Sequence, residues 1–287
     1  MNSNAIKLKY LFIFIFFTLI SCEDPAPTDY TPSYVVQALL LVDEPIKGFQ
    51  IFQTASLTDS FNVENTYYKN AEVKLSGEGQ EFTLYWDEKS LSYNYQDTTY
   101  LVKSKTQYEL KIKLSDGTEI SGTTFTPAKF DWIEKPPVEI QYPKDTLSLP
   151  SSFKISWTKT DTIKYYILSI KALDTLEYGK YLLPPTDEKN RRILQNWNRD
   201  RDRYFRDITS WGFAPASELP GLWNFFKWYG QQELSVYAPD DNFLLWSLQV
   251  FSFSEMNPQL TSIKGAFGYF GSASLIRHQG FLLKNQP

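Results

Sequence analysis

The sequence predicts an all-β protein made of two β-sandwich domains, and three observations lead to that prediction. Apolar and polar residues alternate with a period of two across residues 33–126 and again after residue 151, as in half-buried strands. Aromatic residues make up 17% of the chain, and their side chains fit the pleated surface of a sheet. Proline is concentrated in residues 127–150, between the two alternating regions, which marks a connection between domains.

The first expected domain covers residues 33–127. In residues 71–75 apolar side chains alternate with charged or polar ones, and the alternation resumes over residues 108–114. Asp116-Gly117 then separates two such runs, which is the strongest short-range sign of a β-hairpin. Regularly spaced short strands of this kind favour a sandwich. Their order resembles a transthyretin-like or carboxypeptidase-regulatory-like domain.

The Pro-rich connection is expected over residues 128–150, and the second domain over residues 151–287. The segments FKISWTK and KYYILSIKAL resemble the B and C strands of a fibronectin type III-like sandwich. Their expected later partner is ELSVYAP, in which Leu234, Val236 and Ala238 face inward. The glycine- and aromatic-rich tail GAFGYFGSASLIRHQGFLLK is expected to supply the closing strands.

One apolar run in the second domain allows two interpretations. Residues 243–253 are apolar almost throughout and are either a buried strand or a buried helix, because periodicity alone does not separate these. Asp240 and Asp241 come directly before the run, where they can cap a helix.

An insertion that is not strand-like is expected at about residues 180–229. Residues 191–208 place apolar side chains on one face and arginine and aspartate on the other, which predicts an amphipathic helix. Its charged face is either simply solvated or a docking surface for an acidic partner or for lipopolysaccharide phosphates. The aromatic segment that follows is the best candidate for a functional surface. The candidate contact residues for a partner or ligand are Trp197, Arg199, Arg203, Trp211, Trp223, Phe225, Phe226, Trp228 and Tyr229.

The start of the chain predicts export. An apolar run from Leu11 to Ile20 follows Lys7 and Lys9, and it is too short to cross a membrane as a helix, which takes about 20 residues. A basic start, a short apolar run and small residues after it are typical of a secretory signal. We therefore expect residues 1–21 to be a signal peptide.

The end of that signal predicts a lipid anchor. Leu19-Ile20-Ser21-Cys22 resembles the bacterial lipobox, and Cys22 is the only cysteine in the chain. In lipoproteins this thiol receives a diacylglycerol and the new amino group is acylated, typically with palmitate. Two or more acyl chains give stable attachment to a membrane. The alternative is an ordinary signal in which the cysteine occurs by chance.

Residues 22–32 form an expected tether that is acidic and proline-rich. Glu23 and Asp24 directly after the lipidated cysteine resemble the surface-export signal of Bacteroidota lipoproteins. That resemblance implies an outer-membrane protein that faces the cell exterior. A solvated linker of a periplasm-facing lipoprotein is the other interpretation.

Charge and composition exclude several classes of function. Loss of residues 1–21 removes Lys7 and Lys9, so the net charge changes from −4 to about −6. An acidic chain has no electrostatic reason to bind nucleic acid. No thiol remains after Cys22, so the fold has no internal disulfide.

The residue types and motifs that commonly form catalytic or zinc sites are scarce in this chain. His278 is the only histidine, so a site of clustered histidine ligands for zinc is not expected. A Ser-His-Asp triad would use His278 with Ser272 or Ser274, but no G-x-S-x-G motif surrounds these serines. Glycosidase chemistry needs only two acids, and Asp240 with Asp241 is the first pair to inspect. We expect no enzyme activity, no cofactor and no metal.

Four Asp-Thr sequences match the O-glycosylation sequon of Bacteroidota, in which Asp precedes Ser or Thr and a third residue follows. The other interpretation is that Asp and Thr are common where turns enter strands. The candidate acceptors are Thr98, Thr146, Thr162 and Thr175.

The sequence as a whole resembles an uncharacterised family of Bacteroidota outer-membrane lipoproteins, which is defined only as a domain of unknown function. The resemblance rests on SCEDP, on the strand order up to ISGTTFTPAKFDWI and on the tail IKGAFGYFGSAS, and it covers nearly the whole mature chain. Members of that family often accompany TonB-dependent receptors. The resemblance implies such a partner, and it implies no catalytic residues.

We therefore expect a non-enzymatic, surface-exposed outer-membrane lipoprotein that binds a TonB-dependent receptor in nutrient uptake, with a glycan as a candidate ligand. An accessory subunit of an outer-membrane assembly or secretion complex is the alternative. A carbohydrate-active enzyme is the third interpretation, and a pocket that holds two separated carboxylates would favour it.

Overall fold

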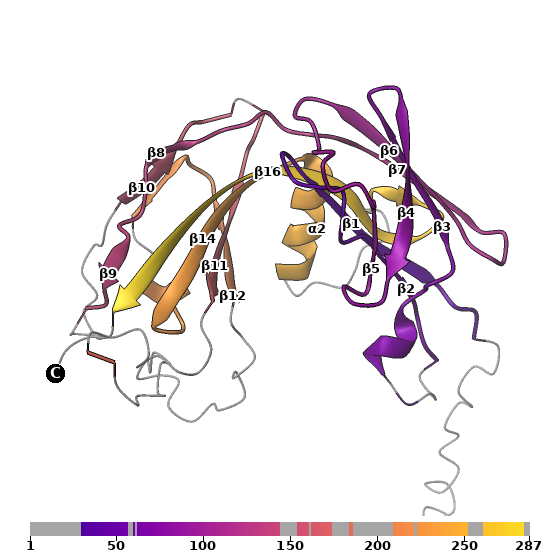
Figure 1. Ribbon diagram of the computed structural model, residues 1–287, viewed down its shortest axis with the longest axis horizontal. Coiled ribbons are helices and arrows are strands. Elements are labelled where there is room, and N and C mark those ends of the chain that lie inside the picture. The colour runs from indigo at the N-terminus through magenta and orange to yellow at the C-terminus, as the bar shows by residue number, and fades with distance from the viewer. Residues whose placement is uncertain are drawn as a thin grey trace, which may run out of the picture.

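The computed structural model is all-β, as predicted, and has two lobes that stand side by side as the two halves of an arch (Figure 1). Helix α2 (Asp241–Phe251) lies in the space between them (Figure 1). No described helix is long and apolar enough to cross a membrane. The residues that the structure describes are 30–56, 60, 62–143, 154–160, 162–173, 184–185, 209–220, 223–251 and 261–283.

The first lobe is a sandwich of a six-stranded sheet, in the order β15-β7-β6-β3-β4-β5, against strands β2, β1 and the first half of β16. Leu40 and Phe270 from one layer pack with Leu75 and Leu110 from the other in a single buried cluster. The strands of this lobe are β1 (Tyr34–Leu41), β2 (Gln50–Gln53), β3 (Glu72–Gly77), β4 (Gln80–Asp87), β5 (Ser92–Asn94), β6 (Gln107–Lys113), β7 (Glu119–Phe125), β15 (Ile263–Lys264) and β16 (Phe267–Leu283), and a 3-10 turn, η1, covers Val63–Thr66.

The hairpin predicted at Asp116-Gly117 joins β6 to β7. The Asp116 side chain accepts a hydrogen bond from the Thr118 amide at 2.8 Å, and Gly117 has the positive φ of 89° that favours glycine. The alternation on both strands places Tyr108, Leu110 and Ile120 in the core. This part of the prediction is confirmed.

The second lobe sets a three-stranded sheet, β13-β10-β8, against the sheet β12-β11-β14-β16. FKISWTK and KYYILSIKAL supply β10 and β11 in opposite layers, and β11 pairs with β14, which contains ELSVYAP. Trp157 and Val236 meet in its core. This pairing is the one expected of a fibronectin type III-like sandwich. The strands are β8 (Trp132–Glu134), β9 (Glu139–Gln141), β10 (Lys154–Trp157), β11 (Tyr166–Ala172), β12 (Thr209–Ala214), β13 (Glu218–Pro220) and β14 (Gly230–Pro239).

Strand β16 is 17 residues long and belongs to both lobes. It runs parallel to β1 from Phe267 to Ala273 and antiparallel to β14 from Ala273 to Leu282 (Figure 1). Residues 263–273 therefore belong to the sheets of the first lobe, not to the second domain as predicted. Parallel pairing joins segments that are far apart in the chain, so the local pattern does not reveal it.

Two other predicted segments differ from the structure. The connection expected over residues 128–150 contains β8 and β9, and the insertion expected over residues 180–229 contains β12, β13 and the 3-10 turn η5 (Trp223–Phe225). Glycine and proline in these segments end short strands instead of excluding them. The helix predicted over residues 191–208 lies outside the described residues.

Residues 241–251 are a helix, which decides between the two interpretations of that apolar run. The Asp240 side chain accepts from the amide of Phe243 at 2.9 Å, as an N-cap does, and the Asp240 carbonyl accepts from the amide of Leu244 at 3.0 Å. Phe243 and Trp246 pack on Tyr269 of β16. The helix is thereby held against the strand that joins the lobes.

Candidate functional site

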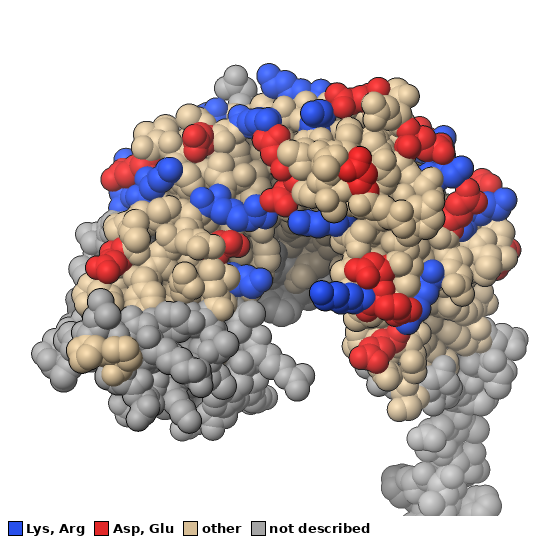
Figure 2. Space-filling model, viewed as in Figure 1, with Lys and Arg blue, Asp and Glu red and all other residues tan. Residues whose placement is uncertain are grey.

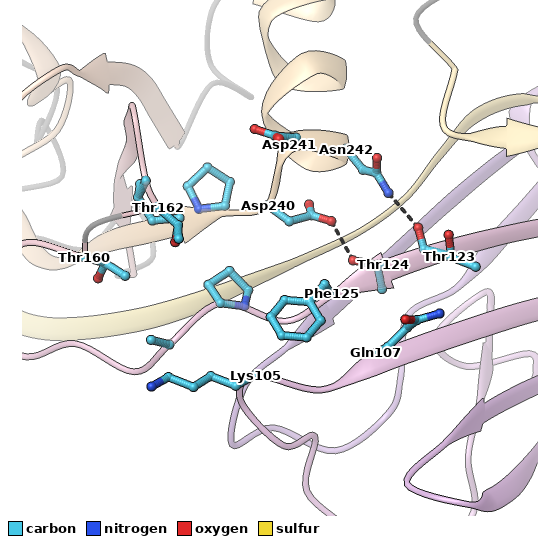
Figure 3. Close-up of a pocket in the computed structure, with 14 residues that line it drawn as sticks. Lys105, Gln107, Thr123, Thr124, Phe125, Thr160, Thr162, Asp240, Asp241 and Asn242 are labelled. Atoms are coloured by element: carbon cyan, nitrogen blue, oxygen red, sulfur yellow. Dashed lines mark hydrogen bonds between the residues drawn. The ribbon is translucent and has the colours of Figure 1, made fainter.

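A cavity of about 710 Å³ lies where the two lobes meet the start of α2 (Figure 3). Its size is typical of sites for small ligands. Figure 2 shows that the molecule is hollowed between the lobes, with acidic and basic side chains interspersed over both. The residues that line the cavity are Lys105, Gln107, Thr123, Thr124, Phe125, Pro127, Ala128, Thr160, Thr162, Ile163, Pro239, Asp240, Asp241 and Asn242.

Asp240 fixes the geometry of the cavity wall. Its Oδ1 accepts from the amides of Phe243 and Ser272 at 2.9 and 3.0 Å, and its Oδ2 accepts from Thr124 Oγ1 at 2.5 Å (Figure 3). One carboxyl group thus joins helix α2, strand β16 and strand β7. Burial raises the pKa of Asp240 above its ordinary value, and these three hydrogen bonds offset part of that rise.

Further hydrogen bonds attach the end of β7 to its neighbours. Asn242 Nδ2 donates to the carbonyl oxygens of Thr123 and Phe270 at 2.8 and 2.9 Å. Ser272 Oγ donates to the carbonyl oxygen of Phe125 at 3.2 Å. The backbone that carries the cavity-lining side chains is therefore held on both sides, so the site is largely formed before any ligand arrives.

Three side chains of β6 and β7 share the exposed face beside the cavity. Gln107 and Phe125 are directly opposite each other in the antiparallel register, and Thr123 lies two residues before Phe125. The alternation that buries Thr124 turns these three outward. Phe125 is 57% exposed and lines the cavity.

The cavity carries one accessible charge of each sign. Lys105 comes from the turn before β6 and Asp241 from the first turn of α2, and they lie on opposite sides of the site (Figure 3). Among the described residues neither of them forms an ion pair. The wall thus offers an ammonium, a carboxylate, amides and hydroxyls around an aromatic ring, which is chemistry for binding by hydrogen bonds and packing.

The pair Asp240 and Asp241 does not act as two equivalent acids. Oδ1 of Asp240 accepts the hydrogen bond that caps α2, Oδ2 accepts from Thr124 of β7, and the adjacent Asp241 is exposed. The sequence predicted that these residues can cap a helix, and Asp240 does so. Within the part of the chain that the structure describes, no three His, Cys, Asp or Glu side chains gather in a way that would hold a metal ion.

Four of the aromatic residues predicted to contact a partner are buried. Trp223, Phe226, Trp228 and Tyr229 are between 1% and 8% exposed, and three of these pack with Tyr142 and Leu234 inside the second lobe. The prediction that they form an exposed surface is therefore wrong. Their side chains fill a core to which strands β9, β11, β14 and β16 also contribute.

The other predicted contact residues have different positions. Trp211 is 40% exposed on β12 and packs on Tyr237, while Phe225 is half-buried against Gly212. Neither of them lines the cavity. Trp197, Arg199, Arg203 and the expected lipidation residue Cys22 lie outside the described residues.

Two candidate glycosylation residues are described, and both are exposed. Thr98 follows Asp97, whose side chain accepts from the Thr99 amide at 2.9 Å, which is the ordinary turn role of such an Asp. Thr162 lies on the rim of the cavity. Thr146 and Thr175 lie outside the described residues.

We predict that the protein purified from its native source has added mass on these threonines. The measurement is intact-mass spectrometry with peptide mapping, and a Thr98→Ala, Thr162→Ala double variant is the control because both side chains are exposed. We expect glycan mass on the peptides that carry these threonines, and part of that mass should be lost in the variant. The absence of any added mass on these peptides would show that these sequences are only turns.

The comparison with known proteins places this site in an uncharacterised family. Residues 23–275 match the model of a domain of unknown function, DUF4249. The chain belongs to the DUF4249 family. The match covers the first lobe, most of the second lobe and every residue that lines the cavity. No curated protein matches the chain.

The residues that line the cavity were mostly missed by the prediction from sequence. Asp240 and Asp241 were singled out, but Lys105, Gln107 and Phe125 were not. A signal for Phe125 is present, because the alternation of β7 that turns Ile120 and Thr124 inward turns Phe125 outward. That an exposed ring lies beside α2 depends on the pairing of distant segments, which the pattern does not contain.

Proposed function

We propose that this DUF4249 protein is a non-enzymatic lipoprotein of the outer membrane that faces the cell exterior. It is anchored through acylated Cys22 and acts as an accessory binding protein of a TonB-dependent receptor in nutrient uptake. The anchor and its compartment follow from the lipobox and from the acidic tether. The partner follows from the resemblance to receptor-associated lipoproteins.

The observation that best supports a binding function is the construction of the cavity. Its paired acids are unequal, because Asp240 is used to hold α2, β7 and β16 together while Asp241 is left exposed. The remaining lining residues offer hydrogen bonds and an apolar ring. A rigid wall of this kind favours capture of a ligand over bond cleavage.

A second candidate function is that of an accessory subunit in an outer-membrane assembly or secretion complex. The observation that favours it is on α2, where Leu245 and Leu248 lie one turn apart and are 42% and 38% exposed. Exposed apolar side chains on a helix between two lobes suit contact with a protein better than contact with a nutrient.

A carbohydrate-active enzyme is the third candidate. Asp240 lines the cavity and has a raised pKa, which is a property of general acids. Its full set of hydrogen bonds to the fold supports the structural role instead. The Asp240→Asn variant in the Discussion separates the two.

The deciding experiment is gentle detergent extraction of native outer membranes, affinity purification of the full-length tagged chain and identification of co-purifying proteins. We expect a TonB-dependent receptor in about equal amount. A Cys22→Ala variant is the control, because it should be released from the membrane and lose the receptor. Assembly or secretion components in place of the receptor would favour the second function, and a chain recovered alone would contradict both.

A further inference from the structure

The exposed ring of Phe125 is the largest apolar group among the residues that line the cavity. It is 57% exposed, and it lies at the end of a strand that is fixed by its neighbours. Its carbonyl oxygen accepts from Ser272 Oγ, and the preceding residue holds Asp240. The ring therefore lines the cavity in a set position and stays more than half exposed (Figure 3).

The polar groups around this ring are arranged at its edge. Gln107 and Thr123 stand beside it on the same face of the sheet, and Thr160 and Thr162 come from the opposite lobe. Together they supply donors and acceptors in similar numbers. A flat apolar centre with a polar margin fits a ligand that has one apolar face and hydroxyl groups at its edge.

The charges of the cavity point to a neutral ligand. Lys105 and Asp241 carry opposite charges, and both carboxyl oxygens of the buried Asp240 are already bonded to the fold. An anionic ligand would meet the Asp241 carboxylate, and a cationic one would meet the Lys105 ammonium. Neutral hydroxyl groups can accept from the ammonium and donate to the carboxylate at the same time.

We propose that the cavity binds one or two neutral sugar units of a glycan, with a pyranose ring stacked on Phe125. The C–H groups on one face of the sugar lie against the negative face of the aromatic ring. Gln107, Lys105 and Asp241 bond the hydroxyl groups at its edge. This inference deepens the proposed function, since it names the chemical class that a binding lipoprotein would collect.

The test uses the full mature chain without its lipid, and four probes at millimolar concentration: maltose, cellobiose, lactose and N,N′-diacetylchitobiose. Binding is measured by isothermal titration calorimetry, and saturation-transfer NMR identifies the sugar protons that lie against the protein. Two variants are compared, Phe125→Ala and Tyr85→Ala. Tyr85 is the matched control, because it is 53% exposed on β4 and does not line the cavity.

We expect at least one disaccharide to bind, with transfer strongest at the C–H protons of one ring face. Phe125→Ala should weaken that binding about tenfold or more, as truncation of a central aromatic contact does. Tyr85→Ala should leave it unchanged. Since both side chains are largely exposed, circular dichroism should show that both variants fold as the parent does.

Three outcomes would overturn the proposal. Sugar binding that survives Phe125→Ala would place the glycan elsewhere. Binding of the dipeptide glycyl-phenylalanine, measured as a fifth probe, in place of all four sugars would show a peptide site. No binding of any probe would exclude a neutral-sugar site. None of these results affects recovery of a receptor with the full-length chain, so this proposal and the proposed function fail separately.

Discussion

Gly268→Ala should destabilise the folded protein by about 3 kcal/mol or more, a large share of the roughly 5–15 kcal/mol by which folded proteins are stable. Gly268 lies in β16 and pairs with Val36 of β1 in the parallel register. A Cβ atom at this position would lie 2.0 Å from the Val36 carbonyl oxygen, where no side chain fits. Backbone, not a flexible side chain, is the obstacle, so the strands would have to separate.

The backbone angle adds to the steric problem. Gly268 has a φ of 103°, a conformation that residues with a Cβ atom rarely adopt. Because β16 carries Phe270 into the first core and Leu282 into the second, separation of β1 from β16 should reduce the stability of both lobes. Urea unfolding of the lipid-free mature chain, followed by far-ultraviolet circular dichroism, measures the loss.

Gly48→Ala is the matched control for this prediction. Gly48 also has a positive φ, of 80°, but a Cβ atom there would meet nothing within 4 Å. The Gly48→Ala variant should lose only about 1 kcal/mol of unfolding free energy, which is the cost of placing a residue with a Cβ atom at a positive φ. If both variants lose the same unfolding free energy, the steric contact between β1 and the new Cβ atom on β16 does not contribute to the destabilisation.

Local patterns predicted the separate strands well because each signal is complete within a short segment. The Asp116-Gly117 turn is stabilised by a hydrogen bond within the turn itself. The residues of ELSVYAP that were predicted to face inward are buried. The capping role of Asp240 could also be predicted from the sequence, because this acid directly precedes the apolar run that forms the helix.

Features that depend on distant pairing were not predictable. The first half of β16 has the same composition whether it pairs with β1 or stays in the second lobe, and only the tertiary structure decides. The cavity exists because that pairing brings β7 beside α2. The aromatic segment was misjudged for a related reason, because Trp223 and Phe226 have no periodic pattern that distinguishes a core from a surface.

Asp240→Ala should destabilise the protein by about 3 kcal/mol, whereas Asp240→Asn should change the free energy of unfolding at pH 7 by about 1 kcal/mol or less. The alanine removes the helix cap and leaves the amides of Phe243 and Ser272 without their side-chain acceptor. The asparagine keeps one oxygen for the two amides, and its NH₂ group can donate to Thr124 Oγ1. Thr124 can then donate to Ser272 Oγ, which is 2.8 Å away.

The two acids should also differ in how stability depends on pH. Burial raises the pKa of Asp240 in the folded protein above the ordinary value of 3.8. As pH rises through that ordinary value, the unfolded chain releases this proton first, so the folded state loses stability until pH exceeds the raised pKa. The difference in stability between the parent and Asp240→Asn should therefore change in favour of the variant as pH rises from about 4, and it should stop changing once pH exceeds the raised pKa. Urea unfolding of the parent and both variants across this pH range measures the effect.

The Asp240→Asn variant also decides whether Asp240 is a structural or a catalytic acid. If Asp240 only joins α2, β7 and β16, the variant keeps its stability and its ligand binding, because Phe125 and Asp241 still face the cavity. If Asp240 were a general acid, the parent would hydrolyse a glycan and the equally stable variant would not. If the parent binds sugar without cleaving it and the variant binds the sugar equally well, Asp240 has a structural role and is not a general acid.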